Sequence, residues 1–420
     1  MRTDNLNIPL VSDIAEAKLR LKGVVNETPL LFNKNLSESF GARIFLKRED
    51  LQVVRSYKIR GAYNKMSALN DADKINGVVC ASAGNHAQGV AYACRILDIQ
   101  GTIFMPTPTP AQKVNQVKNF GGDNVKIVLI GDTFDDAFDE ATNFCETSEA
   151  TFIHPFNDSE VIAGQGTVAI EILEGIKEPI DYLILPIGGG GLASGVSTWF
   201  KEYSPNTKII GVEPEGAAAM IASVEAGELT TLDHIDKFVD GAAVRAVGEL
   251  NYKICKENLS DFIKVPEGQI CTTILKLYNE EAIVAEPAGV LSISALEFIK
   301  DKIKGKTVVS VLSGGNNDIV RTEEIKERSL LYEGLKHYFI ISFPQRAGAL
   351  REFLVDVLGP NDDITHFQYS KKNSRERGPA VIGVELKYKA DFNGLLERLK
   401  KLNFKYEYLN ENPELFHHLI

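Results

Sequence analysis

The chain has 420 residues, more than a single ordinary hydrophobic core organises, so two or three domains are expected. With 44% hydrophobic residues its composition is that of an average globular protein, which excludes a fibrous or intrinsically disordered chain. The net charge of −11 argues against a nucleic-acid partner, because a phosphate backbone would be repelled.

The amino terminus and the cysteines indicate a cytoplasmic protein. The first residues, MRTDNLNIPLVSDIAEA, contain no apolar signal segment, and no run approaches the roughly 18 apolar residues that a membrane-spanning helix needs. Five scattered cysteines, never in a CxxC spacing, are expected to be reduced core residues rather than disulfides or zinc ligands: Cys80, Cys94, Cys145, Cys255 and Cys271.

Three apolar runs, each followed directly by a turn of glycines or other small residues, predict buried parallel strands. The strands are expected at 77–81, 182–187 and 308–312, and the turns read SAGNHAQG, GGGGLASG and SGGNND. In open α/β folds, ligands collect at the carboxyl ends of such strands. Residues 1–330 are therefore expected to form an α/β domain with a cofactor cleft.

The first candidate chemical group in chain order is Lys58, in the segment RSYKIRGA. A lysine in a closed cleft can have its amine pKa lowered enough to attack a carbonyl group, whereas an isolated lysine at a helix start is usually just solvated. The SAGNHAQG turn comes next, and its small residues expose backbone amides that suit a carboxylate. In that turn Asn85 can bond an oxygen anion, while His86 fits a buried structural role better than a catalytic one.

The glycine run that follows the second strand suits a phosphate group. Four consecutive glycines between a strand and a helix let the backbone approach an anion, although a flexible turn has the same composition. The run is neither GxGxxG nor a Walker A sequence, so a nucleotide is not favoured. Ser313, at the end of the third strand, can present its hydroxyl to a ligand or simply cap a turn.

A second unit is expected after about residue 330, beyond the charged stretch RTEEIKERSLLYEG. Alternation and apolar stripes predict strands at 338–343, 364–370, 380–387 and 404–408, with helices over 347–357 and 395–402. The order β-α-β-β-α-β is that of a ferredoxin-like α+β domain.

Taken together, these elements resemble the active site of the fold-type II pyridoxal-phosphate enzymes, most closely the threonine dehydratase group. The resemblance covers nearly the whole chain: S-x-K-x-R-G-A around Lys58, S-x-G-N-H-x-x-G from Ser82, the tetraglycine run, AEPAG at 285–289 and SGGN from Ser313. It implies two open, mostly parallel sheet subdomains, the smaller spanning about 52–157 and inserted in the larger. Residues 331–420 resemble the single ACT-like regulatory domain of the shorter biosynthetic enzymes.

The resemblance also implies roles for the residues that match the family motifs. Lys58 would hold pyridoxal 5'-phosphate as a Schiff base and move the Cα proton, Asn85 would bond the ring 3-oxygen, and Ser313 would bond the ring nitrogen. Glu286 would lie near the ring. The phosphate would be held by the backbone amides of Gly188, Gly189, Gly190, Gly191 and Leu192, and the substrate carboxylate by Ser82, Ala83, Gly84, Asn85 and His86.

The activity that the resemblance implies is the dehydration and deamination of L-threonine to 2-oxobutanoate and ammonia, the first step of isoleucine biosynthesis. A serine at the ring nitrogen keeps that nitrogen neutral, which favours elimination over transamination. The protein would be a homo-oligomer, a dimer or a tetramer, inhibited by isoleucine with valine opposing it. Residues 343–350 are the expected lip of the effector site, and a purely assembling role for the second unit is the alternative.

Two positions depart from the family pattern. Many relatives have Phe where this chain has Tyr57, a change that is not expected to abolish activity. In the related serine racemases a divalent ion is held by the equivalent of Glu213 and an acidic residue six places later; this chain has Ala219 there, so no divalent metal is expected, while a monovalent cation remains compatible.

Other enzymes of the same fold share most of these motifs, including serine/threonine dehydratases, serine racemases, cysteine synthases and threonine synthases. The ferredoxin-like unit argues against the racemases and cysteine synthases. A non-catalytic amino-acid sensor is the alternative from another class, but it would need neither Lys58 nor Ser313.

Overall fold

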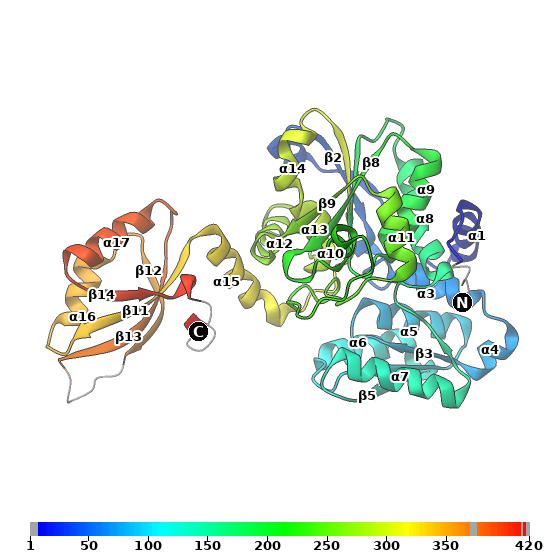
Figure 1. Cartoon of the computed structure of the whole chain (residues 1–420), viewed down its shortest axis with the longest axis horizontal. Coiled ribbons are helices and arrows are strands. Elements are labelled where there is room, and N and C mark those ends of the chain that lie inside the picture. The colour runs from blue at the N-terminus through cyan, green and yellow to red at the C-terminus, as the bar shows by residue number, and fades with distance from the viewer. Residues whose placement is uncertain (1–6, 370–375, 413–414, 417–420) are drawn as a thin grey trace. The chain divides into compact units, whose positions relative to one another are not determined.

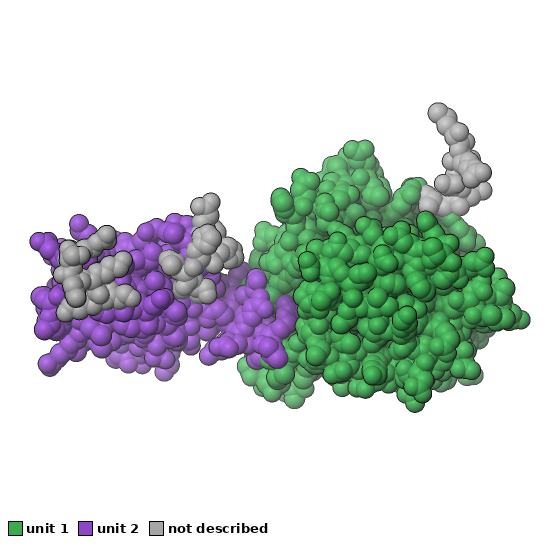
Figure 2. Space-filling view, turned by 90° about the horizontal axis from the view of Figure 1, so that it is seen from below, with its two compact units in different colours: residues 1–319 green, residues 320–420 purple. Residues whose placement is uncertain are grey.

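The structure is a computed structural model that describes residues 7–369, 376–412 and 415–416. The chain divides into two compact units, Met1–Ile319 and Val320–Ile420, which are coloured separately in Figure 2. Within the described residues, no helix is both long and apolar enough to cross a membrane.

The first unit contains a larger sheet of six strands in the order β1-β2-β10-β7-β8-β9. Figure 1 labels β2, β8 and β9 of this sheet. β1 is antiparallel to β2, and all other neighbours are parallel. Every residue of β7 and β10 is buried, which explains why both strands are predominantly apolar, with only Thr307 and Ser310 as polar residues in β10. The strands are β1 (Leu30–Phe32), β2 (Arg43–Arg48), β7 (Tyr182–Pro186), β8 (Lys208–Pro214), β9 (Asp261–Val265) and β10 (Thr307–Leu312).

A smaller, fully parallel sheet is inserted between β2 and β7, with the order β5-β4-β3-β6. Its central strands are short and buried, and helices cover them (Figure 1). The strands are β3 (Val78–Ala81), β4 (Gly101–Met105), β5 (Val125–Leu129) and β6 (Thr151–Phe152). The two sheets thus form the two subdomains of one unit.

One or more helices follow most strands of the first unit. They are α1 (Val11–Leu21), α2 (Lys34–Phe40), α3 (Lys58–Ser67), α4 (Asp71–Asn76), α5 (Asn85–Leu97), α6 (Ala111–Gly121), α7 (Phe134–Ser148), α8 (Ser159–Gly175), α9 (Gly191–Tyr203), α10 (Ala219–Ala226), α11 (Glu249–Asn258), α12 (Glu267–Glu281), α13 (Leu291–Ser294) and α14 (Leu296–Ile303). Four of the five cysteines are buried among these elements, and Cys145 is partly buried.

Glycines allow α3 and α9 to pack closely on α8. A Cβ at Gly195 in α9 would lie 2.2 Å from the carbonyl oxygen of Ile162, and one at Gly61 in α3 would lie 2.8 Å from Val161. Only glycine fits such close helix contacts. The helix that begins with Lys58 and the helix that follows the glycine run are therefore both fixed against α8.

The second unit has the antiparallel sheet order β12-β13-β11-β14 and the element order β-α-β-β-α-β that the sequence predicted. Helix α16 is a single turn continued by a π turn at 353–357, rather than one regular helix over 347–357. Ser370, expected at the end of a strand, lies outside the described residues. The elements are α15 (Thr322–Glu333), β11 (Lys336–Pro344), α16 (Ala349–Glu352), β12 (Asp363–Tyr369), β13 (Arg377–Glu385), α17 (Asp391–Lys401) and β14 (Lys405–Tyr408).

The second unit begins at Val320, before the boundary at 330 that the change in composition suggested. The reason is that α15 is bonded to the first strand of this unit. Glu327 accepts a hydrogen bond from the Tyr338 hydroxyl at 2.5 Å and pairs with the Lys336 amine at 3.3 Å. The charged stretch is thus the first helix of the second unit and not a segment that precedes it.

Candidate active site

Lys58 is the first residue of α3 and is partly buried. Its Nζ donates a hydrogen bond to the carbonyl oxygen of Pro155 at 2.8 Å. Burial lowers the pKa of Lys58 to about 8, against the opposing effect of the nearby Glu286 carboxylate. A lowered pKa makes the neutral amine more available, and this is the form that attacks carbonyl groups and removes protons.

The glycine run lies between β7 and α9 and has no space for side chains. A Cβ at Gly189 would lie 2.2 Å from the ring of Phe156, and Gly190 has a φ of +95°. In the described part of the chain, no protein group accepts a hydrogen bond from the amides of residues 188–192. Open amides at the start of a 13-residue helix, next to its positive dipole end, suit a phosphate.

The Ser82–His86 turn connects β3 to α5. The amide of Gly84 donates to the Ser82 hydroxyl at 3.2 Å, and the first amide of the helix that finds an acceptor is that of Gln88, on the Gly84 carbonyl. Within the described residues, the amides of Asn85, His86 and Ala87 have no acceptor. This helix start therefore has room for a carboxylate.

Two histidines, the buried His86 and the partly buried His154, lie near the lysine. His86 Nε2 lies 2.8 Å from the carbonyl oxygen of Ile153, and burial lowers its pKa to about 3. His154, which the sequence analysis did not single out, accepts hydrogen bonds at Nδ1 from the amides of Phe156 and Asn157, and burial lowers its pKa to about 4. Both rings are therefore neutral at physiological pH and hold the backbone around Lys58.

Ser313 is buried at the end of β10. Its hydroxyl donates to the carbonyl oxygen of Ala288 at 3.3 Å, and its own carbonyl oxygen accepts from the amide of Tyr57 at 3.3 Å. Ser313 is thereby joined to the residue before Lys58. Gly289 of the AEPAG motif is required nearby, because a Cβ there would lie 2.1 Å from the carbonyl oxygen of Gly314.

Asn85 connects the turn to residues that follow α12 and β10. Its Nδ2 donates to Glu286 Oε1 at 2.6 Å, and its Oδ1 accepts from Asn316 Nδ2 at 2.6 Å. Burial and the charge of Asp240 raise the pKa of Glu286 to about 7. The structure thus brings Glu286 into direct contact with a predicted site residue and adds Asn316, which had not been singled out.

The segment 153–157, after β6, links the separate motifs and was missed from the sequence. Its signal is positional, because polar residues follow the carboxyl end of a parallel strand. The carbonyl oxygens of Ile153 and Pro155 bond the side chains of His86 and Lys58, respectively. Asn251 Nδ2 donates to the carbonyl oxygens of both Phe156 and Gly189, which joins this segment to the glycine run. Asn157 Oδ1 accepts a hydrogen bond from the amide of Leu250.

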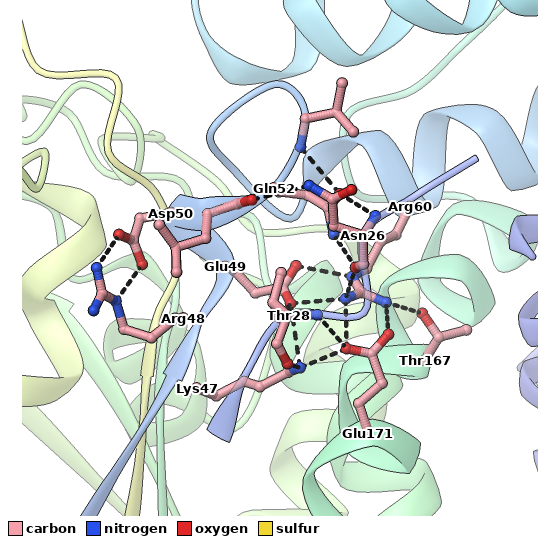
Figure 3. Close-up of polar contacts among 12 residues, drawn as sticks. Asn26, Thr28, Lys47, Arg48, Glu49, Asp50, Gln52, Arg60, Thr167 and Glu171 are labelled. Atoms are coloured by element: carbon pink, nitrogen blue, oxygen red, sulfur yellow. Dashed lines mark hydrogen bonds and ion pairs between the residues drawn. The ribbon is translucent and has the colours of Figure 1, made fainter. Parts of the chain in front are cut away.

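A buried network of charges anchors α3 two residues beyond Lys58 (Figure 3). The Arg60 guanidinium makes bidentate hydrogen bonds with Glu49, at 2.8 Å each, and also pairs with Glu171 at 2.6 and 2.8 Å. Lys47 Nζ pairs with Glu171 at 2.5 Å, and Thr28 donates its hydroxyl hydrogen to Glu49. The two positive and two negative charges balance, which is what allows Lys47, Glu49 and Arg60 to be fully buried while the Glu171 side chain keeps 11% exposure.

The residues present fit pyridoxal phosphate. Besides the open amides of the glycine run, the buried side chain of Gln165 has neither its nitrogen nor its oxygen bonded to any described group. This amide borders the run, since a Cβ at Gly191 would lie 2.5 Å from Gln165 Oε1. Buried polar atoms without a partner, beside a helix start whose amides are open, indicate a site that binds a polar ligand.

Glu213, the position compared above with a metal ligand of serine racemases, accepts hydrogen bonds from the start of α10. Its two oxygens accept the amides of Met220 and Ile221 at 2.8 Å each, at the start of α10, and burial raises its pKa to about 8. Among the residues that the structure describes, no three His, Cys, Asp or Glu side chains group as a metal site.

Two family models match the chain. Residues 21–314 match "Pyridoxal-phosphate dependent enzyme", and residues 327–419 match "C-terminal regulatory domain of Threonine dehydratase". Fold and site therefore define a pyridoxal-phosphate dependent enzyme.

Curated relatives make the assignment more specific. Over 410 residues the chain is 59% identical to "L-threonine dehydratase biosynthetic IlvA" of Halalkalibacterium halodurans, covering 98% of this chain and 99% of that protein. The protein of the same name from Bacillus subtilis is 58% identical, with 98% and 97% covered. The chain belongs to the family of biosynthetic L-threonine dehydratases with a C-terminal regulatory domain.

Solved structures match about three quarters of the chain. The processed form of threonine deaminase isoform 2 from Solanum lycopersicum is 39% identical, with a TM-score of 0.71, over 76% of this chain and 94% of that one. The T.th. threonine deaminase is 34% identical, with a TM-score of 0.70, over 74% of this chain and 99% of that one.

Proposed function

We propose that the cleft of the first unit converts L-threonine to 2-oxobutanoate and ammonia with Lys58 as the residue that holds pyridoxal phosphate. In the net reaction the water lost from Cα and Cβ is regained when the released product hydrolyses, so one threonine yields one oxoacid and one ammonia. When bound, the cofactor supplies an electron sink for the pair left by the Cα–H bond. The observation that carries the proposal is the partly buried Lys58 amine, with its lowered pKa, bonded to Pro155 in the segment whose next residue, Phe156, packs on the glycine run.

The two helix starts have separate tasks in this proposal. The amides of residues 188–192 hold the cofactor phosphate, and the Ser82–His86 turn holds the substrate carboxylate. Both anions are then stabilised by helix dipoles, which positions the substrate Cα close to the Lys58 amine. Asn85 donates to the ring oxygen.

Lys58 takes the proton from the substrate Cα. The carbonyl of Pro155, which accepts a hydrogen bond from Nζ, steadies the amine for this transfer. Ser313 offers the ring nitrogen a neutral hydroxyl, so the nitrogen is not forced to carry a proton and loss of the β-hydroxyl competes well with transamination.

The substrate test is an oxoacid assay on the purified protein with L-threonine and with L-serine. We expect 2-oxobutanoate and ammonia in equal amounts from threonine, and faster turnover of threonine than of serine. Faster formation of pyruvate from serine would make the protein a serine dehydratase of the same fold, and D-amino acids without oxoacid would make it a racemase.

The second unit is proposed to bind isoleucine as an inhibitor, with valine opposing it, in a homo-oligomer of two or four chains. The expected lip, 343–350, contains Gly348, with a φ of +82°, and Gln345, whose side-chain nitrogen and oxygen are buried without a described partner. Nearby, Leu354 and Val355 are 45% and 68% exposed, which supports a contact between copies. Repeating the threonine assay with millimolar isoleucine and valine tests the regulation, and light scattering tests the oligomer.

The cytoplasm is the proposed location. Support comes from the cysteines Cys80, Cys94 and Cys255, which are buried thiols in the core of the first unit rather than disulfides. Fractionation of cells with an antibody to the protein tests it.

A further inference from the structure

Asn85, Glu286 and Asn316 form a chain of hydrogen bonds whose direction is determined by one backbone group. Asn316 Nδ2 donates to the carbonyl oxygen of Val54 at 2.9 Å, and a carbonyl oxygen can only accept. Asn316 therefore presents N–H to Asn85 as well, so the Asn85 oxygen must face Asn316 and its nitrogen must face Glu286. The orientation of the Asn85 amide follows from Val54 and cannot be reversed without losing bonds.

The chain of bonds joins parts of the first unit that are far apart in sequence. Asn85 begins α5 of the smaller subdomain, Val54 precedes α3, Glu286 follows α12, and Asn316 follows β10. Close packing fixes the Glu286 end, because a Cβ at Gly314 would lie 2.1 Å from Glu286 Oε1. Tight packing and paired polar atoms leave the amide little freedom to rotate.

One hydrogen of the Asn85 amide remains for a ligand. The amide nitrogen carries two hydrogens, and Glu286 accepts one of them. We infer that Glu286 and Asn316 are positioning residues, which hold Asn85 so that its remaining N–H is always directed as a donor to the anionic ring oxygen of the cofactor. This inference rests on the proposed role of Asn85 in binding that oxygen.

A fixed orientation of the Asn85 amide would affect the charge on the ring oxygen of the cofactor. A fixed donor stabilises the negative charge on the ring oxygen, whereas an amide free to turn would present its carbonyl oxygen to that charge part of the time. Removing either positioning residue should therefore change the visible absorption band of the bound cofactor and weaken cofactor binding, in the same direction as removing the Asn85 amide itself.

The experiment compares the visible spectrum and the cofactor dissociation constant of the full-length protein with those of Asn85→Ala, Glu286→Leu, Asn316→Asp and Glu286→Gln. Asn316→Asp removes the N–H group that donates to the Asn85 oxygen, and Glu286→Leu removes the oxygen that accepts from the Asn85 nitrogen. Glu286→Gln keeps an acceptor oxygen of the same size. We expect the first three variants to shift the band alike and to weaken cofactor binding by about tenfold or more, as loss of a hydrogen bond to a charged group does, and Glu286→Gln to stay near wild type.

A double variant and a control make the outcome decisive. Asn85→Ala with Glu286→Leu should shift the band no more than Asn85→Ala alone, because both act through one amide. Asn33→Asp, the same change at a buried helix cap away from the cleft, should leave the band unchanged. If Asn316→Asp does not fold, Glu286→Leu and the double variant still decide the question.

The possible failures are distinguishable. An unchanged band in Asn85→Ala would remove the proposed role of Asn85 itself. A shifted band in Asn85→Ala, with wild-type spectra and cofactor binding in Glu286→Leu and Asn316→Asp, would overturn the positioning roles and leave the proposed function intact.

Discussion

At the scale of single residues, burial determines what each polar group of the cleft can do. The same environment that lowers the pKa of Lys58 to about 8 raises that of Glu286 to about 7, so both groups lie close to a change of charge at physiological pH. His86 and His154, with pKa values near 3 and 4, stay neutral. Lys58 is therefore better suited than either histidine to exchange a proton with the substrate.

Ser313→Asp should divert part of the reaction from elimination to amino-group transfer. A carboxylate at the ring nitrogen favours its protonated form, which prolongs the life of the carbanion and gives transamination more time. The measurement is the ratio of 2-oxobutanoate to the amino form of the cofactor over many turnovers.

Ser310→Ala is the control for that change, because Ser310 is a buried serine within β10, three residues before Ser313, and its hydroxyl has no described partner. Its product ratio should equal that of the wild type. An unaltered ratio in Ser313→Asp as well would mean that Ser313 does not contact the ring.

At the scale of elements, the cleft depends on how closely α3, α8 and α9 pack and on the glycine run that precedes α9. A methyl group at Gly189 would overlap the Phe156 ring, and relieving it must move either the run or the segment that bonds Lys58. Overpacking of this kind typically costs about 1–3 kcal/mol.

Gly189→Ala is accordingly expected to weaken cofactor binding by roughly 5- to 150-fold, the range that about 1–3 kcal/mol represents. Titration of the cofactor-free protein with pyridoxal phosphate, followed by fluorescence, measures the effect. Gly394→Ala, in α17 of the second unit, should bind like wild type. Equal affinity in both variants would show that the run does not cradle the phosphate.

The buried charge network should make the first unit sensitive to acid. Burial raises the pKa of Glu49, but the charge and hydrogen bonds of Arg60 and the charge of Lys47 outweigh it, so the pKa lies below its ordinary value of 4.5. A carboxylate with a lowered folded-state pKa contributes stability above the unfolded pKa and loses it as the pH falls through the folded pKa. Urea unfolding of the wild type should therefore show stability decreasing on acidification below about pH 4.5.

In Glu49→Gln the folding stability should decrease less on acidification, because the contribution of the Glu49 carboxylate is absent. The variant should also be less stable than wild type at neutral pH, because Arg60 loses a charged partner. Parallel pH curves for the two proteins would contradict the assignment of the shift to Glu49.

At the scale of the whole molecule, the two units are separable in architecture. The T.th. threonine deaminase aligns over 99% of its own chain with only 74% of this one. A truncated protein ending at Ile319 should still form 2-oxobutanoate from threonine but no longer respond to isoleucine. Threonine saturation curves with and without isoleucine measure this, and a truncated protein that is still inhibited would place the effector site in the first unit.

Sequence reasoning could predict the parts of the site that are local in the chain. The glycine run, the Ser82–His86 turn and Lys58 are each short motifs at the end of a strand or the start of a helix, where local backbone chemistry determines the structure. The order of elements in the second unit was predictable because apolar periodicity sets it.

Other parts could not be predicted because they depend on contacts between distant segments. The partners of Arg60, namely Glu49 and Glu171, come from different elements, and the orientation of Asn85 depends on Asn316 and Val54. Composition also does not show that α15 contacts β11, the contact that brings α15 into the second unit of the structure.

The claim that Lys58 carries the cofactor is tested most directly by locating the attachment. Borohydride treatment of the pyridoxal-phosphate-loaded, full-length protein fixes the cofactor to the lysine that it occupies, and mass spectrometry of the peptides identifies that residue. We predict a single modified peptide containing Lys58, and no such modification in Lys58→Ala, which should also retain less than about a thousandth of the wild-type activity. A cofactor fixed to another lysine, or full activity in Lys58→Ala, would contradict the account.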